Sequence, residues 1–148
     1  MAEEEADLNA SGRTTTRTSR ILLAEDDIEM RKLLAWRLEE DGYDVVEAEN
    51  GLELLECLEP SLLYARTFGR ISEFDLVVSD IRMPGLSGLE VLAGLRKRDK
   101  VTPVILITAF GDQVTHDEAN ELGASAVIDK PFDIDELRAT IRRIIPPR

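Results

Sequence analysis

The sequence predicts an α/β fold with a doubly wound sheet of five parallel strands and helices on both of its faces. One observation is that five short apolar runs alternate along the chain with amphipathic segments of helical period. A second is that each run is continuously apolar, as strands are when helices cover both faces of a parallel sheet. Because crossovers between parallel strands are right-handed, such a chain winds helices onto both sides of the sheet.

The first two units are predicted from a strand at 21–24 and a strand at 45–46. The first strand precedes a helix that ends near Gly42, since glycine is common just after a helix C-terminus. The apolar stripe of that helix consists of Met30, Leu33, Leu34 and Leu38. After the second strand, Asn50 is predicted as an N-cap with Glu53 three residues later, so a second helix follows.

Three more strands are predicted, at 76–78, 104–107 and 126–128. Each precedes a helix whose start carries Ser, Thr or Asp followed three residues later by Glu, the capping-box pattern. These pairs are Ser87 with Glu90, Thr115 with Glu118, and Asp133 with Glu136. The helix after the fourth strand has only a thin apolar stripe, of Val114, Ala119 and Leu122, and is predicted to be among the weaker elements.

Residues 1–19 are predicted to be a disordered tail, because they combine an acidic run, a Ser/Thr/Arg stretch and almost no apolar residues. The folded domain is therefore predicted over residues 20–148, a length sufficient for one domain with its own core. No DNA-binding or catalytic domain follows within these residues. We expect the folded part either to act alone or to belong to a longer regulator.

The composition argues against several partners and environments. With 18 Lys and Arg against 30 Asp and Glu, the net charge is −12, which disfavours direct binding to nucleic acid or to an anionic membrane. No apolar run approaches the roughly 20 residues that span a bilayer, and the acidic N-terminus does not have the pattern of a secretory signal. The single Cys57 cannot form an internal disulfide, which fits a reducing compartment. We expect a cytoplasmic protein.

Polar residues stand at the predicted carboxyl ends of four strands. They are Glu25, Asp26 and Asp27 after the first strand, Asp80 after the third, Thr108 after the fourth and Lys130 after the fifth. In a doubly wound sheet, sites lie at this edge, so these side chains are expected to converge. Each alone has an ordinary explanation, because an acidic residue can cap a helix, a threonine can bond nearby backbone, and a lysine is usually solvated.

Together, these residues indicate chemistry on phosphate. Carboxylates gathered at one point repel each other unless a cation joins them, and a cluster of hard oxygen ligands suits Mg²⁺. A lysine and a hydroxyl group beside that cluster suit an anion. A cation site, an anion site and a carboxylate nucleophile are the equipment for phosphoryl transfer to an aspartate.

From residue 20 onward, the sequence resembles the receiver domains of two-component response regulators. The segments that carry the resemblance are ILLAEDD (21–27), DLVVSDIRMPGLSGLEVL (75–92), PVILITAFGD (103–112) and GASAVIDKPFDIDEL (123–137). The resemblance implies a flavodoxin-like (βα)5 fold with strand order 2-1-3-4-5. It also implies a phosphorelay protein that takes a phosphoryl group from a sensor histidine kinase or a phosphotransfer protein. Phosphorylation would then switch a protein–protein interaction surface toward a downstream effector protein or an output domain.

The resemblance further implies a role for each site residue. Asp80 is expected to be the phosphoacceptor, Thr108 to bond the phosphoryl group, and Lys130 to pair with Asp80 and then with the phosphate. The expected Mg²⁺ ligands are Asp26, Asp80 and the backbone carbonyl of Arg82, with Glu25 reaching the metal through water.

Other expectations concern residues near the site and departures from the family pattern. Asp27 is expected to start the first helix, and the Lys130–Pro131 bond is expected to be cis, as is usual in the family. Val127 stands where the family often has an aromatic switch residue, which puts that switch in doubt. The second helix is predicted to end before Pro60. Residues 61–72 are predicted to be an insertion, either a partner surface or a decorated loop with an extra helical turn.

Such a receiver is not expected to be an enzyme in the ordinary sense, although it assists its own phosphorylation and dephosphorylation, and a homodimer is left open. One alternative is a receiver-like docking module that never carries phosphate, but the complete set of site residues weighs against it. Another is a Mg²⁺-dependent phosphatase that acts through an aspartate. That enzyme would need a second carboxylate two residues after its nucleophile, where Arg82 stands.

Overall fold

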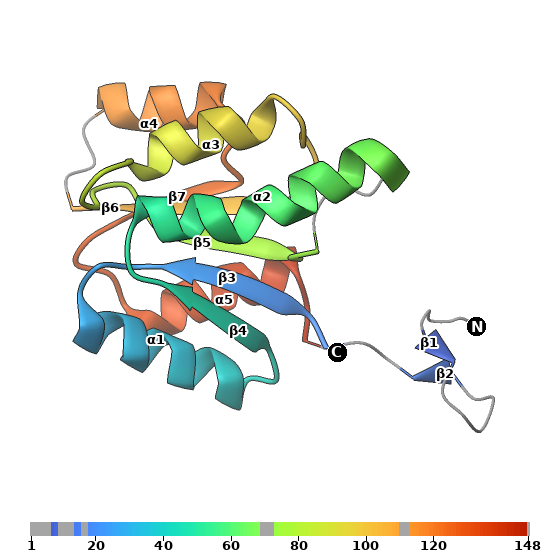
Figure 1. Ribbon diagram of the computed structural model, residues 1–148. Coiled ribbons are helices and arrows are strands. Elements are labelled where there is room, and N and C mark those ends of the chain that lie inside the picture. The colour runs from blue at the N-terminus through green and yellow to red at the C-terminus, as the bar shows by residue number, and fades with distance from the viewer. Residues whose placement is uncertain (1–6, 9–13, 16–17, 69–72, 110–112, 148) are drawn as a thin grey trace.

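The computed structural model describes residues 7–8, 14–15, 18–68, 73–109 and 113–147. Among these residues, one five-stranded parallel sheet has the order β4-β3-β5-β6-β7, which confirms the predicted doubly wound fold and strand order 2-1-3-4-5 (Figure 1). Its strands are β3 (Arg20–Ala24), β4 (Asp44–Ala48), β5 (Leu76–Asp80), β6 (Val104–Thr108) and β7 (Ala126–Asp129). The helices are α1 (Ile28–Glu40), α2 (Gly51–Phe68), α3 (Gly88–Arg96), α4 (Gln113–Glu121) and α5 (Ile134–Ile144).

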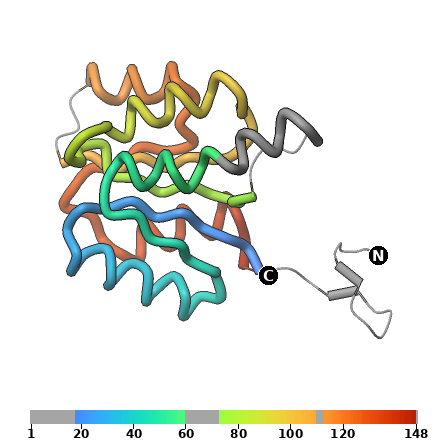
Figure 2. The backbone as a smooth tube through the Cα atoms, in the orientation of Figure 1, coloured from blue at the N-terminus to red at the C-terminus, as the bar shows by residue number. Residues whose placement is uncertain are grey.

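The helices form two layers, with α1 and α5 on one face of the sheet and α2, α3 and α4 on the other (Figures 1 and 2). Successive strand residues point to opposite faces, so Leu22 belongs to one apolar core while Ile21 and Leu23 belong to the other. The central strands β5 and β6 are buried at every position. Burial on both faces explains why the strands are continuously apolar in sequence.

Several helix starts are as predicted. The Ser87 hydroxyl accepts a hydrogen bond from the Glu90 N–H (3.1 Å), and the Glu90 carboxylate accepts one from the Ser87 N–H (2.8 Å), which completes a capping box. Asp133 caps α5 by accepting a hydrogen bond from the Asp135 N–H (2.9 Å). Asn50 accepts from the Glu53 N–H (2.8 Å) at the start of α2. Local sequence determines such caps, because donor and acceptor lie within three residues of each other.

The predicted end of the second helix before Pro60 is wrong, because α2 continues through that residue to Phe68. A proline inside a helix removes one backbone hydrogen bond, and the turns on either side keep their own. The first part of the predicted insertion 61–72 is therefore helical, as the alternative of an extra helical turn proposed, and residues 69–72 lie outside the described residues.

Two further details of the predicted helices are corrected. The capping box at Thr115 is wrong, because α4 already begins at Gln113 and Thr115 lies inside it. The Gln113 amide donates to the Asp117 carboxylate (2.8 Å), and such an i,i+4 pair stabilises the first turn. Leu33 does not belong to the buried stripe of α1, since it is 38% exposed. The buried stripe instead consists of Arg31, Leu34, Ala35 and Leu38.

Most of the predicted tail, residues 1–19, lies outside the described residues, so its disorder stays a prediction. Within it, β1 (Asp7–Leu8) and β2 (Thr14–Thr15) pair as an antiparallel ladder. At its end, the Ser19 carbonyl accepts a hydrogen bond from the Asp44 N–H (2.9 Å), next to β3.

Over the described part of the chain, no helix is both long enough and apolar enough to cross a membrane.

Candidate functional site

Three carboxylates lie together at the carboxyl edge of the sheet. Glu25 and Asp26 follow β3, and Asp80 is the last residue of the neighbouring strand β5. An oxygen of each carboxylate lies within 4.8 Å of an oxygen of the others. Glu25 and Asp80 are 2% and 4% exposed, whereas Asp26 is open to solvent. The predicted convergence of these acidic residues is therefore what the sheet produces.

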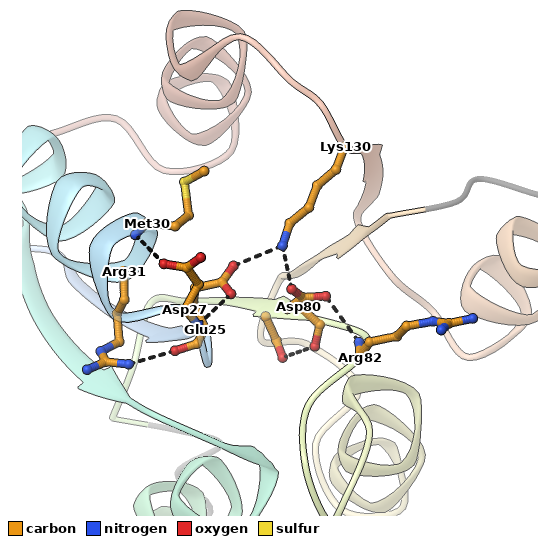
Figure 3. Close-up of polar contacts among 8 residues, drawn as sticks. Glu25, Asp27, Met30, Arg31, Asp80, Arg82 and Lys130 are labelled. Carbon is orange, nitrogen blue, oxygen red and sulfur yellow. Dashed lines mark hydrogen bonds and ion pairs between the residues drawn. The ribbon is translucent and has the colours of Figure 1, made fainter.

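Lys130 joins this cluster from the end of β7 (Figure 3). Its Nζ donates to Asp80 Oδ2 (2.6 Å) and to Glu25 Oε1 (3.2 Å). The Lys130 N–H donates to the Thr108 carbonyl (2.7 Å), which holds the start of the loop against β6. The Lys130–Pro131 peptide bond is cis, as predicted. The cation is thus fixed at both its backbone and its ammonium group, directly against the Asp80 carboxylate.

Burial and the charges in the cluster together shift the pKa values of Glu25 and Lys130. Burial raises the pKa of Glu25, and the nearby Asp80 charge acts in the same direction, against the hydrogen bond from the Asp27 N–H and the charge of Lys130. Burial alone would lower the pKa of Lys130, but the hydrogen bond and charge of Asp80, together with the charge of Glu25, outweigh burial and raise it. Lys130 therefore stays a cation, whereas the charged form of the buried Glu25 carboxylate is destabilised.

The residues around Asp80 and Glu25 are held by the backbone that follows each strand. Asp80 Oδ1 accepts a hydrogen bond from the Arg82 N–H (3.1 Å). Glu25 Oε2 accepts one from the Asp27 N–H (3.0 Å), and Asp27 itself is the N-cap of α1, accepting from the Met30 N–H (3.0 Å). The prediction that Asp27 starts the helix is therefore confirmed. The role of the Arg82 carbonyl as a metal ligand stays a prediction.

Thr108 ends β6, between the ends of β5 and β7, and is 3% exposed. The register pairs Asp80 with Ile107, so Thr108 follows directly beside the carboxylate cluster. The structure thus brings Glu25, Asp26, Asp80, Thr108 and Lys130 to one edge of the sheet. Their roles in binding and chemistry stay predictions.

Sequence reasoning missed one residue that contacts this site, Arg31 of α1. Its Nη1 donates to the Glu25 carbonyl (2.8 Å), and its Nε donates to Glu47 Oε1 (3.0 Å), as Figure 3 shows for Glu25. Arg31 is 5% exposed. The signal available in the sequence was its position three residues before Leu34 and seven before Leu38, on the stripe of α1 that faces the sheet.

The donor set fits a hard divalent cation. Three carboxylates face one lysine, which leaves an excess of negative charge in a partly buried place. Burial raises the pKa of Glu25, and repulsion by the nearby Asp80 charge adds to that rise. Oxygen ligands, some of them open to water, are the kind of set that binds Mg²⁺.

Comparison with known proteins assigns the family. The family model described as "Response regulator receiver domain" matches residues 21–142. The chain is 40% identical over 127 residues to the "Transcriptional regulatory protein CpxR homolog" of Haemophilus influenzae, covering 86% of this chain and 50% of that protein. It is 33% identical to "Sporulation initiation phosphotransferase F" of Bacillus subtilis, covering 86% of this chain and 94% of the relative. The chain thus spans about half the length of the first of these relatives.

Solved structures agree with this assignment. A receiver domain protein described as CheY-like, from Methanospirillum hungatei, has a TM-score of 0.75 at 26% identity, covering 86% of this chain and 93% of the other. The response regulator protein TrrA of Thermotoga maritima, solved in complex with Mg²⁺ and BeF, has a TM-score of 0.69 at 35% identity, covering 86% of this chain and 99% of the other. The family match over residues 21–142 includes the acidic cluster and Lys130, and this chain belongs to the response regulator receiver domain family.

Proposed function

We propose that this receiver accepts a phosphoryl group on Asp80, in a reaction that depends on Mg²⁺, and that the modification switches a protein–protein interaction surface. One observation carries the proposal: the Asp80 carboxylate is buried at the strand edge between a lysine ammonium group 2.6 Å away and two further carboxylates. A buried carboxylate with a cation on one side and a metal-binding set on the other has what aspartyl phosphorylation requires.

Asp80 acts as the nucleophile through a carboxylate oxygen. With a phosphohistidine donor, the phosphorus–nitrogen bond breaks as the oxygen–phosphorus bond to Asp80 forms. The imidazole takes up the bonding electron pair and then a proton, and the product on this chain is an acyl phosphate. Because the transition state is loose and spreads charge over the phosphoryl oxygens, the protein's contribution is position and compensating charge.

The residues around Asp80 divide this work. Asp26, Asp80 and the Arg82 carbonyl would hold Mg²⁺, with Glu25 reaching it through water, and the bound ion supplies positive charge next to the transferred group. Lys130 pairs with Asp80 before the reaction and with the phosphoryl oxygens after it, since the raised pKa keeps it charged. The hydroxyl of Thr108 donates to the same group. The same set assists loss of the phosphoryl group to water.

The donor in this proposal is a sensor histidine kinase or a phosphotransfer protein, and the recipient of the signal is a downstream effector protein or an output domain. Two comparisons support it: a relative of similar length is named a sporulation phosphotransferase, and TrrA was solved with Mg²⁺ and BeF. We further propose a cytoplasmic location, a folded unit over residues 20–148 after a tail at 1–19, and no direct contact of this domain with nucleic acid or membrane. Self-association into a homodimer is a possible form of the switched surface.

Phosphorylation with a small-molecule donor tests the proposal directly. Incubation with acetyl phosphate and Mg²⁺ should add one phosphoryl group per chain. Mass spectrometry should then show an increase of about 80 Da, the mass of one HPO₃ unit. Asp80→Asn and a chelator should each abolish the increase, while Asp75→Asn, a carboxylate beside the start of β5, should leave it unchanged. Undiminished labelling of Asp80→Asn would refute the assignment of Asp80, whereas no labelling of the wild type would favour the non-phosphorylated docking module.

A further inference from the structure

Arg31 is a charged residue buried in the helix layer behind the acidic site. It is 5% exposed and shares the inward stripe of α1 with Leu34 and Leu38. Arginine is seldom buried unless its donors are bonded. Here Nη1 donates to the Glu25 carbonyl (2.8 Å), and Nε donates to Glu47 Oε1 (3.0 Å). One guanidinium group therefore connects α1, the edge strand β4 and the chain segment that leaves β3.

The backbone of Glu25 is held from two directions. Its N–H donates to the Ala48 carbonyl (3.1 Å), which extends the β3–β4 ladder by one residue. Its carbonyl accepts from Arg31, and its carboxylate accepts from the Asp27 N–H and from Lys130. Of these contacts, only the one from Arg31 acts on the peptide group that joins Glu25 to Asp26.

That peptide group determines where Asp26 points. A peptide unit is planar, so fixing the carbonyl of Glu25 also fixes the direction of the Asp26 N–H and the position of its Cα. Among the described residues, no hydrogen bond to the Asp26 carboxylate is found, and the side chain is exposed. Its place within 4.8 Å of Glu25 and Asp80 oxygens therefore depends on the backbone that carries it.

We infer that Arg31 is a positioning residue for the metal site: by holding the Glu25 carbonyl, it keeps the Asp26 carboxylate where it can share a Mg²⁺ ion with Asp80. The inference rests on the proposed function, because it concerns the same site. Glu47 supports Arg31 in turn. The β3–β4 register places Glu47 beside Leu23, on the side of the sheet where α1 lies, and its carboxylate orients the guanidinium group.

Positioning and simple charge predict opposite effects on metal affinity. A guanidinium cation near a divalent cation repels it, so if Arg31 acted only through its charge, removing that charge would tighten Mg²⁺ binding. If Arg31 positions Asp26, a substitution of Arg31 leaves every ligand residue present. It does, however, allow the peptide group between Glu25 and Asp26 to rotate. Loss of such an outer contact weakens metal binding by about 10-fold to 100-fold.

The experiment is a Mg²⁺ titration of the full chain, followed by amide NMR shifts, for the wild type, Arg31→Gln and Arg31→Lys. We expect the dissociation constant of Arg31→Gln to rise about 10-fold. Its initial rate of labelling by acetyl phosphate should return to within about 3-fold of the wild type at saturating Mg²⁺, because the direct ligands remain. Arg31→Lys keeps the charge and one donor group but not the planar guanidinium group. Its Mg²⁺ dissociation constant should therefore lie between those of the wild type and Arg31→Gln.

Arg138→Gln is the matched control. Arg138 also ties α1 to another element, through hydrogen bonds of 2.6 and 2.8 Å to Asp41, but at the end of α1 far from the site. Its loss should lower the melting temperature and leave Mg²⁺ affinity unchanged. An Arg31→Gln constant equal to or below that of the wild type would overturn the inference, as would an equal weakening in Arg138→Gln.

Two provisions keep the result decisive. If Arg31→Gln does not fold, as judged by its amide spectrum, Arg31→Lys decides, and a constant no higher than that of the wild type contradicts the inference. If the wild type itself shows no saturable Mg²⁺ shifts, the proposed function fails. If the wild type binds Mg²⁺ and the Arg31 variants bind it equally well, only the positioning role fails.

Discussion

At the scale of single residues, two adjacent aspartates are expected to have opposite effects on the stability of the fold. Asp26 is exposed and belongs to a cluster of like charges, whereas Asp27 caps α1 by accepting the Met30 N–H. A cluster of carboxylates without its cation costs stability, while an N-cap contributes it. The same side chain is thus a proposed metal ligand at one position and a helix cap at the next.

Replacing Asp26 with Ala should slightly stabilise the metal-free protein, raising its melting temperature by about 1 °C, because one of the mutually repelling charges is removed. The rise in melting temperature that Mg²⁺ causes in the wild type should be lost, because a direct ligand is missing. Thermal melts with and without Mg²⁺ measure both effects. Asp27→Ala is the control: it should cost about 1 kcal/mol through the lost cap and still respond to Mg²⁺. A full Mg²⁺ response in Asp26→Ala would contradict its assignment as a ligand.

At the scale of elements, α3 and α4 have equal length but differ in how many of their residues are buried. Each spans 9 residues, and both lie on the same face of the sheet (Figure 1). Four residues of α3 are buried, namely Gly88, Val91, Leu92 and Leu95. In α4 the buried residue is Ala119, and Val114 is 75% exposed. The predicted weakness of α4 therefore has a physical basis in how little apolar surface it buries.

Hydrogen exchange should show this difference. We expect the amides of α4 to exchange at least about 10-fold faster than those of α3, relative to unstructured peptides, because local opening of α4 exposes less apolar surface. The measurement is amide exchange by NMR on the unphosphorylated protein, with α3 as the internal control. Such an element is the one that a charge change at the neighbouring end of β6 can shift most easily. Equal protection in the two helices would remove this reason to regard α4 as mobile.

At the scale of the whole molecule, an ion pair joins the two helices that cover one face of the sheet. Asp41, the residue after α1, accepts hydrogen bonds from Nη2 (2.6 Å) and Nε (2.8 Å) of Arg138 in α5. These contacts lower the pKa of Asp41 from its ordinary value of 3.8, chiefly through the hydrogen bonds from Arg138. Residues 97 positions apart in the chain are linked in this way.

This pair should make part of the stability depend on pH. The pKa of Asp41 is lower in the folded state than in the unfolded state. The stability that Asp41 contributes is therefore fully present at pH values above its unfolded-state pKa, and it is lost as the pH falls through its folded-state pKa. Asp41→Asn should therefore lower the melting temperature by about 3 °C at pH 7, with the difference shrinking below pH 4. Melts from pH 2 to pH 8 test this. Asp44→Asn, which removes a more exposed carboxylate paired with Arg20 at 3.2 Å, should shift the melting temperature less at every pH. A constant difference for Asp41→Asn down to pH 2 would count against the ion pair as its cause.

The sequence by itself determined the strand–helix order, the N-caps at Asn50, Ser87 and Asp133, and the meeting of acidic residues with Lys130 at one edge of the sheet. These features depend on local periodicity, on donors and acceptors a few residues apart, and on the rule that parallel strands end at the same edge. The resemblance to a known family added the cis peptide bond before Pro131, and the structure confirms it.

Only the tertiary structure decided what depends on neighbours distant in sequence. The exposure of Leu33 follows from which face of α1 packs against the sheet. The passage of α2 through Pro60 and the start of α4 at Gln113 also depart from what local propensity predicted. Arg31 shows the reason most clearly. Its burial is tolerable because the β3–β4 pairing brings Glu47, 16 residues away, and the Glu25 carbonyl to its guanidinium group. No pattern within α1 records those two partners, since the sheet alone places them there.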